Sequence, residues 1–333
     1  MISRRKFVRD MAVAGAASAF GISPCVFAAE PPPETNRIRI GRSAAICSAP
    51  KDVAEELLRG EGFTDVQYVQ TAIGVPLIKT VAAGGADLGI STAGQLVTQI
   101  DAGDSIVMLA GVHVGCYELF GTDRIRAVSD LKGRTVGVDS FESGHYFTLA
   151  TMLAHVGLRP RKDVNVVAQP FGDSMQHLTA GKIDALVAFP PEPQEMRARK
   201  IGHVVISTIL DRPWSQYFCC LLYANTAFVR KHPAATKRAA RAVLKATDIC
   251  ALEPERVARL LVDKGYTPRF DYALQALKDI PYNRWREFNP EDSIRFYALR
   301  LHEAGMIKSN PQKILAQGTD FRFHNELKKE LKA

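Results

Sequence analysis

Residues 83–90 have the sequence AGGADLGI, and residues 180–187 have the sequence AGKIDALV. In each stretch a glycine ends a helical pattern, and an aspartate then precedes a short apolar run that is typical of a buried strand. The two stretches are too far apart in the chain for a solenoid repeat, but their spacing suits two similar α/β units. We therefore expect two lobes built from the same series of elements.

Strand-like and helix-like segments alternate around both stretches. We expect strands at residues 37–41, 66–70, 87–91, 106–112, 135–138, 164–168, 183–189 and 204–209. Helical patterns separate them, at residues 49–58, 76–83, 94–100, 143–156, 174–180 and 192–199. This alternation predicts an α/β fold with mostly parallel sheets covered on both faces. Three more helices, at 233–252, 254–264 and 289–304, are expected to pack back on the first lobe.

Length and composition suit a globular protein of about two domains. The chain has 333 residues, 47% of them hydrophobic, which argues against disorder and coiled coil. Lys and Arg total 43 against 35 Asp and Glu, a formal charge of +8 that is too weak and scattered to predict nucleic-acid binding.

The N-terminus has the three parts of an export signal. A basic cluster is followed by an apolar run at residues 11–22, shorter than the roughly 20 residues that span a bilayer, and then by small residues before Ala28. Ser3-Arg4-Arg5-Lys6-Phe7 resembles the twin-arginine motif, although an ordinary secretory signal is the alternative. We expect a twin-arginine-type signal peptide over residues 1–28 with cleavage after Ala28, a loose Pro-rich tether over 29–36, and a periplasmic protein.

The cysteines do not form a recognisable framework. Beyond Cys25 in the signal there are five, an odd number without a CxxC pair, which argues against a disulfide scaffold or a zinc ribbon. We interpret most of them as buried small hydrophobic residues, with a vicinal Cys219–Cys220 disulfide as the alternative. His113 and Cys116 have a metal-like spacing but no obvious partners, so we expect no metal site and no cofactor.

Two further motifs complete an ordered set of four: DLKGRTVGV at 130–138 and FVRKHP at 228–233. With 83–90 and 180–185, they resemble the periplasmic solute-binding proteins of ABC importers, in the nitrate/sulfonate/taurine and NMT1/THI5-like group. The resemblance covers residues 37–265 and implies a two-lobed periplasmic-binding-protein type II fold. It implies lobe one from 37–116 and 224–333 and lobe two from 117–223, with crossings near 116–119 and 222–223.

Candidate ligand contacts lie where expected strands end, since open α/β sheets bind ligands at that edge. In lobe one they are Ser43, Ala44, Ile46, Thr92, Ala93, Gly94 and Gln95. In lobe two they are Ser140, Ser143, Gly144, His145, Phe189 and Glu192. The crossings implied by the resemblance add His113, Tyr117, Trp214 and Tyr217. Each group also has a structural interpretation: a βα turn, a helix cap, a first-turn acid or hinge packing.

No catalytic signature is present: the chain has no GxSxG elbow, HExxH, P-loop or GxGxxG. Phe218-Cys219-Cys220 falls far short of the cysteine-rich run of the yeast THI5-type pyrimidine synthases. We therefore expect a binding protein and not an enzyme. The resemblance implies a monomer that clamps a small solute and delivers it to a membrane permease with its ATPase.

The solute is expected to be organic, and anionic or planar: a sulfonate, an aromatic carboxylate or a pyrimidine-like compound. Glu142 would repel a compact anion such as nitrate or bicarbonate. The alternative function is an exported sensor or accessory subunit with no role in transport.

Overall fold

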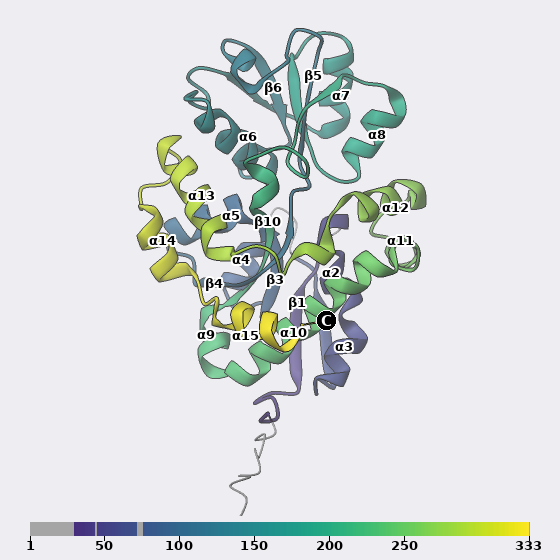
Figure 1. Cartoon of the computed structure of the whole chain (residues 1–333), viewed down its shortest axis with the longest axis vertical. Coiled ribbons are helices and arrows are strands. Elements are labelled where there is room, and N and C mark those ends of the chain that lie inside the picture. Colours follow the sequence, from purple (N-terminus) through teal and green to yellow (C-terminus); the bar gives the residue numbers. More distant parts are fainter. Residues whose placement is uncertain (1–29, 44, 72–75, 333) are drawn as a thin grey trace, which may run out of the picture. The chain divides into compact units, whose positions relative to one another are not determined.

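The computed structural model describes residues 30–43, 45–71 and 76–332, and its frame is a pair of five-stranded mixed sheets flanked by helices (Figure 1). The expected signal peptide at residues 1–28 lies outside the described residues, as does Ala44.

The first sheet has the strand order β2-β1-β3-β10-β4. Its strands are β1 (Arg37–Gly41), β2 (Asp65–Val69), β3 (Leu88–Thr92), β4 (Ile106–Val114) and β10 (Phe218–Asn225). The first three run parallel, whereas β10 runs antiparallel to both β3 and β4. Every residue of β4 and β10 is buried, as expected for apolar strands covered on both faces, even though β4 is the edge strand of the sheet.

The second sheet repeats this order as β7-β6-β8-β5-β9. Its strands are β5 (Glu118–Gly121), β6 (Thr135–Val138), β7 (Asn165–Ala168), β8 (Ala185–Ala188) and β9 (His203–Ser207). Strand β5 runs antiparallel to β8 and β9, in the position that β10 occupies in the first sheet.

The antiparallel strands β5 and β10 correct the sequence-based expectations. The resemblance implies crossings at both segments, whereas the structure pairs them within the sheets, which are therefore more mixed than the alternation of strands and helices predicts. All of β10 belongs to the first sheet, so the chain returns before Phe218 and not near Leu222–Tyr223. The physical reason is its apolar composition, FCCLLYAN, which is buried by pairing in the middle of a sheet.

Helices connect the strands. In the first series they are α2 (Ala49–Val53), α3 (Glu55–Gly60), α4 (Leu77–Ala82) and α5 (Ala93–Asp101). In the second they are α6 (Gly144–His155), α7 (Phe171–Thr179) and α8 (Glu192–Arg199). Short 3₁₀ turns occur at Ile46–Ser48, Val128–Leu131, Trp214–Gln216 and Tyr282–Arg284.

The C-terminal part is helical: α9 (Thr226–Lys231), α10 (Pro233–Leu252), α11 (Pro254–Asp263), α12 (Phe270–Asp279), α13 (Pro290–Glu303), α14 (Pro311–Gly318) and α15 (Arg322–Glu330). As expected, α10 packs on α2, and α14 and α15 contact β4. Two helices also contact the second series, α12 at α8 and α13 at α6. The helical part therefore touches elements of both series.

The start of the described chain is less loose than the Pro-rich tether predicted. Glu34 accepts hydrogen bonds from the backbone N–H groups of Ala234 (2.9 Å) and Ala235 (2.8 Å), at the first turn of α10. Burial alone would raise the pKa of Glu34. The backbone hydrogen bonds to its carboxylate outweigh this effect, and the pKa is lowered. A carboxylate here satisfies N–H groups that have no partner within the helix.

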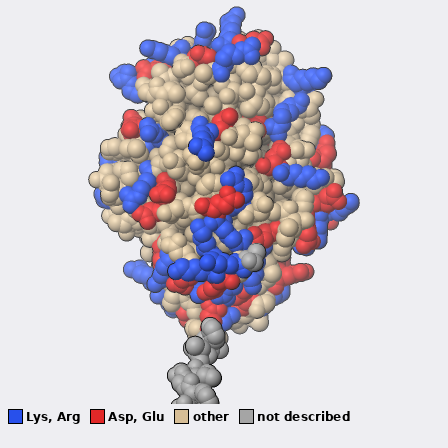
Figure 2. Space-filling model, in the orientation of Figure 1, with Lys and Arg blue, Asp and Glu red and all other residues tan. Residues whose placement is uncertain are grey.

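Charges of both signs are interleaved on the face shown in Figure 2. Many are paired: Glu61, for example, lies within ion-pair distance of Arg238, Arg241 and Lys245. Among the helices of the described residues, none is long and apolar enough to cross a membrane.

Candidate functional site

A pocket of about 380 Å³ lies where strands of the two sheets end. Its first-lobe lining comes from the segment after β1, from the start of α4, and from the junction of β3 and α5. Its second-lobe lining comes from the loop after β6, the first turn of α6 and the end of β8. This is the edge at which open α/β sheets bind ligands.

Nine of the predicted contacts line this pocket: Ser43, Thr92, Gln95, Tyr117, Ser140, Ser143, Gly144, His145 and Phe189. The other lining residues are not among the predicted contacts, although the Glu142 carboxylate is already expected beside the site: Ala45, Cys47, Ser48, Pro76, Leu77, Ile78, Ile90, Ser91, Asp139, Glu142 and Cys220. Five of the eleven, Ala45, Cys47, Ser91, Asp139 and Glu142, are immediate neighbours of predicted residues, and for these the strand-end position was the available signal.

The remaining predicted contacts lie elsewhere. Ile46, Ala93 and Gly94 are buried and do not line the pocket. Trp214 is buried with its ring edge-on to His155, and Tyr217 stacks on Phe296 with ring centroids 4.2 Å apart. These two aromatic side chains pack against helices α6 and α13 and do not line the pocket.

Three aromatic rings form one wall of the pocket, which we call the aromatic wall: Tyr117, His145 and Phe189. The rings of Tyr117 and Phe189 stack at 5.7 Å, and His145 meets them edge-on at 5.5 and 5.4 Å. Offset and edge-on contacts are the favourable geometries for aromatic pairs. The wall is therefore a packed, aromatic part of the pocket lining.

Glu192 stands behind this wall and positions it. One carboxylate oxygen lies 3.1 Å from Nε2 of His145 and accepts the backbone N–H of Phe189 at 2.8 Å. Glu192 itself does not line the pocket. Of the two roles considered for this residue, direct contact or a first-turn acid, the geometry supports a structural one at the start of α8.

The first turn of α6 approaches the aromatic wall closely because residue 144 is glycine. A Cβ atom at Gly144 would lie 2.1 Å from the Tyr117 hydroxyl oxygen. The preceding residue, Ser143, caps the helix by accepting the N–H of Tyr146. This arrangement brings Ser143, Gly144 and His145 into the pocket lining.

Gln95 links the two lobes across the pocket. Its side-chain oxygen accepts hydrogen bonds from Ser91 (3.3 Å) and Thr92 (3.0 Å). Its amide nitrogen donates to the backbone carbonyl of Glu142 at 3.0 Å, in the loop before α6. The bond joins the start of α5 to the second lobe.

The charge that the pocket offers is negative. Asp139 and Glu142 line it, and the described lining residues include no Lys or Arg. The buried Lys51 lies behind it and donates to the carbonyl of Ser43 at 3.1 Å, but its charge is paired with Asp52 at 2.6 Å. Burial lowers the pKa of Lys51.

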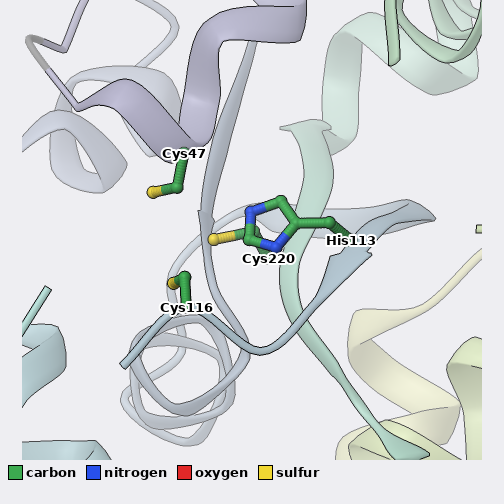
Figure 3. A group of neighbouring side chains, drawn as sticks. All are labelled: Cys47, His113, Cys116 and Cys220. Atoms are coloured by element: carbon green, nitrogen blue, oxygen red, sulfur yellow. The ribbon is translucent and has the colours of Figure 1, made fainter. Parts of the chain in front are cut away.

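Below the pocket lies a thiol–imidazole cluster of Cys47, His113, Cys116 and Cys220 (Figure 3). Their sulfur and nitrogen ligand atoms all lie within 4.8 Å of one another, and all four side chains are buried. The cysteines are free thiols, and Cys47 and Cys220 reach the pocket lining. The expectation that His113 and Cys116 lack partners is therefore wrong.

The strand register explains how these residues meet. Because β10 is antiparallel, its first residues lie at the edge where β3 and β4 end, and Cys220 pairs with both Thr92 and His113. Cys219 lies beside the cluster, with its sulfur 3.2 Å from that of Cys116. The hydrogen bond with Cys116 lowers the pKa of Cys219, while burial raises that of Cys116. Prediction missed the cluster because it missed β10.

Comparison with known proteins gives one family and many similar folds. The model of the NMT1/THI5 like family matches residues 60–257, more than half of the chain. No curated protein sequence matches the chain.

Among solved structures, the periplasmic nitrate-binding protein NrtA from Synechocystis PCC 6803 is similar, with a TM-score of 0.71 at 16% identity over 91% of this chain and 90% of that one. The alkanesulfonate-binding protein SsuA from Xanthomonas axonopodis pv. citri, bound to MOPS, has a TM-score of 0.67 at 16% identity, covering 88% and 100%. The desulfurization enzyme DszB has a TM-score of 0.62 at 15% identity, covering 90% and 100%. These similarities establish the periplasmic binding protein fold.

Proposed function

Because the chain belongs to the NMT1/THI5-like family, we propose that it is the extracytoplasmic solute-binding component of an ABC importer and not an enzyme. The similar fold of the nitrate-binding NrtA and the sulfonate-binding SsuA supports this proposal. The partners are then a membrane permease and its ATPase. The expected export signal supports a periplasmic location.

The observation that carries the choice of solute is that the aromatic wall and the carboxylates of Asp139 and Glu142 line the same pocket. A planar ring can lie against Tyr117 and Phe189, while N–H groups on its edge donate to Asp139 or Glu142. A sulfonate or nitrate would face these carboxylates with no Lys or Arg among the described lining residues to pair it. The solute class we propose is therefore a pyrimidine-like nitrogen heterocycle.

The size of the pocket agrees with this class. A volume of about 380 Å³ lies at the lower end of small-molecule sites, which range from about 300 to 1,000 Å³. The bond from Gln95 to the Glu142 carbonyl joins the lobes beside the ligand. Opening the pocket would break this bond, and closure would exclude water and strengthen polar contacts to the solute.

The test is a thermal-shift screen of the purified chain. The panel contains aminopyrimidines, aromatic carboxylates, alkyl and aryl sulfonates, and nitrate. A ligand at 100 times its Kd stabilises the folded state by about 2.7 kcal/mol, which raises Tm by several degrees. We expect the largest rise with an aminopyrimidine, and a larger rise with sulfonate or nitrate would contradict the proposed solute class.

A pair of variants tests the carboxylate contact. Glu142→Gln removes a pocket charge, and Glu56→Gln removes an exposed charge on α3 as the matched control. Hydrogen bonds to charged groups contribute about 1.5–3 kcal/mol, so we expect Glu142→Gln to weaken heterocycle binding by roughly tenfold or more. Calorimetric titration measures this, and equal affinities in the two variants would rule the contact out.

Transport is separated from the alternative, a sensor or accessory subunit, by uptake. Cells lacking the protein should lose high-affinity uptake of the labelled ligand and regain it with the wild-type chain. Intact uptake in the deletion strain, with ligand binding retained by the pure protein, would favour the alternative. Recovery of chemically unchanged ligand after incubation with the protein is expected of a binder.

A further inference from the structure

Four nitrogen- and sulfur-bearing side chains meet at one buried point beneath the pocket (Figure 3). They come from four places in the chain: Cys47 from the turn after β1, His113 from β4, Cys116 from the crossing to β5, and Cys220 from β10. We propose that this thiol–imidazole cluster is a binding site for a thiophilic divalent metal ion of the zinc type.

The donor set matches what zinc prefers. Structural zinc sites are four-coordinate with Cys and His ligands, and three cysteines with one histidine are a common set. Thiolate ligands also select against magnesium and calcium, which take oxygen. The four residues supply one ligand atom each, with no carboxylate among them.

The spacing requires only a small contraction. With Zn–S bonds of about 2.3 Å, tetrahedral geometry places ligand atoms about 3.8 Å apart. The four atoms here already lie within 4.8 Å of one another. Three of the four residues sit on or next to paired strands, so side-chain rotation, rather than backbone movement, supplies the difference.

His113 is already oriented as a metal ligand. Its Nδ1 lies 2.8 Å from the carbonyl oxygen of Gly115, so this nitrogen donates a hydrogen bond and Nε2 is the atom left to bind a metal ion. Nε2 is buried and has no hydrogen-bond partner among the described residues. A buried polar nitrogen without a partner is costly, and a metal ion would satisfy it.

Gly115 makes this orientation possible. Its φ of +58° is in the left-handed region, and a Cβ atom there would lie 2.6 Å from backbone atoms of Ile209. The backbone at this point therefore both turns toward the second sheet and presents its carbonyl to His113. The crossing and the cluster are built from the same few residues.

Binding is an acid–base step with no change of oxidation state. Three S–H bonds break, their protons go to solvent, and three metal–sulfur bonds and one metal–nitrogen bond form. A divalent ion with three thiolates and a neutral imidazole leaves one net negative charge. The ion would tie the turn after β1 to β4, β10 and the crossing, beneath a pocket whose floor includes Cys47 and Cys220.

The experiment uses the full chain, purified under reducing conditions and stripped of metal. We expect Zn²⁺ to bind one ion per chain in equilibrium dialysis with elemental analysis. Co²⁺ serves as a spectroscopic probe, and we expect sulfur-to-cobalt charge-transfer bands together with the d–d bands of a tetrahedral site. Zn²⁺ should displace Co²⁺, raise Tm and release up to three protons per chain.

Variants locate the ion. Cys47→Ser and Cys220→Ser each remove a ligand, and we expect at least a hundredfold loss of Zn²⁺ affinity and loss of sulfur-to-cobalt bands. Cys250→Ser is the matched control, because Cys250 is a buried free cysteine on α10 outside the cluster. We expect this variant to bind as the wild type does.

Three results would overturn the proposal. One is wild-type protein that binds no Zn²⁺ and gives no sulfur-to-cobalt bands, a readout that does not depend on any variant folding. Another is Zn²⁺ affinity unchanged in Cys47→Ser and Cys220→Ser. The third is a Cys116–Cys219 disulfide, found by thiol alkylation and mass mapping of protein isolated from cells, because it would consume one ligand. The solute screen is independent of all three.

Discussion

The two sheets share one strand order, but the residues at their pocket edges differ in chemical type. In the first sheet, β10 brings Cys220 beside His113, and the edge carries thiols, hydroxyls and an amide. In the second sheet, the corresponding edge carries Phe189, His145 and the carboxylates of Asp139 and Glu142. The frame is repeated, while the chemistry at the strand ends is not.

Their cores differ as well. The main hydrophobic cluster includes residues of both sheets and of the C-terminal helices, such as Leu244 on α10 and Ile294 on α13. One part of the second sheet has a separate small cluster around Phe120, Leu186 and Met196. If the proposed function holds, the first sheet is the larger packed platform and the second sheet supplies the aromatic and acidic contacts to the solute.

The largest expected effect is at the junction between the two sheets. Gly115→Ala combines a left-handed φ with a backbone clash at 2.6 Å, so we expect a loss of about 3 kcal/mol or more in the free energy of unfolding. Gly133→Ala is the control, because its φ of +73° is similar but a Cβ there meets nothing within 4 Å. We expect a loss of about 1 kcal/mol in this control by urea denaturation. Equal losses would show that the junction tolerates the close approach.

A second prediction concerns the pH dependence of stability in the core beneath the first sheet. His324 is buried against the rings of Phe218 and Trp285, and burial, with the charge of Lys328, lowers its pKa to about 4. The unfolded chain takes up this proton near pH 6.5, whereas the folded chain resists it until about pH 4. The stabilising contribution of neutral His324 is therefore fully present above pH 6.5. It falls by about 3 kcal/mol as the pH drops to 4.

A comparison of variants separates the contribution of His324 from that of the other titrating groups. In His324→Gln the drop in unfolding free energy between pH 6.5 and 4 should shrink, whereas His302→Gln, at an exposed position of α13, should keep the wild-type profile. Identical pH profiles for all three proteins would mean that burial of His324 does not contribute to acid sensitivity.

A third prediction sharpens the role of the second lobe. Gly144→Ala places a Cβ 2.1 Å from the Tyr117 hydroxyl, so we expect a loss of about 1–3 kcal/mol in stability and a clear loss of solute affinity. Gly172→Ala, near the start of α7, meets nothing within 4 Å and should be neutral or slightly stabilising. Full solute affinity in Gly144→Ala would place the solute away from the first turn of α6.

The smallest effect is expected behind the aromatic wall. Glu192→Ala leaves the Phe189 N–H and His145 without their partner and should cost about 1–2 kcal/mol in unfolding free energy. Glu195→Ala on the same helix breaks only an exposed pair with Arg199, at 3.0 Å, and should cost less than about 0.5 kcal/mol. Matching losses in the two variants would remove Glu192 from the set of positioning residues.

Most of the repeated frame was predictable, because helix and strand periodicity is local. The helix at 192–199 and the strands at 37–41 and 135–138 occur where they were expected. The two strands that prediction missed, β5 and β10, are the ones whose pairing partners come from distant parts of the chain. Their apolar runs are equally compatible with a crossing or a buried strand.

The sequence by itself determined the alternation of elements, the two-lobed α/β class and the strand-end segments that line the pocket, because each depends on neighbours within a few residues. Only the tertiary structure decided which side chains meet. Trp214 and Tyr217 turned away to pack on other rings, while Cys47, His113, Cys116 and Cys220 came together. That meeting depends on the antiparallel register of β10, which a one-dimensional pattern does not contain.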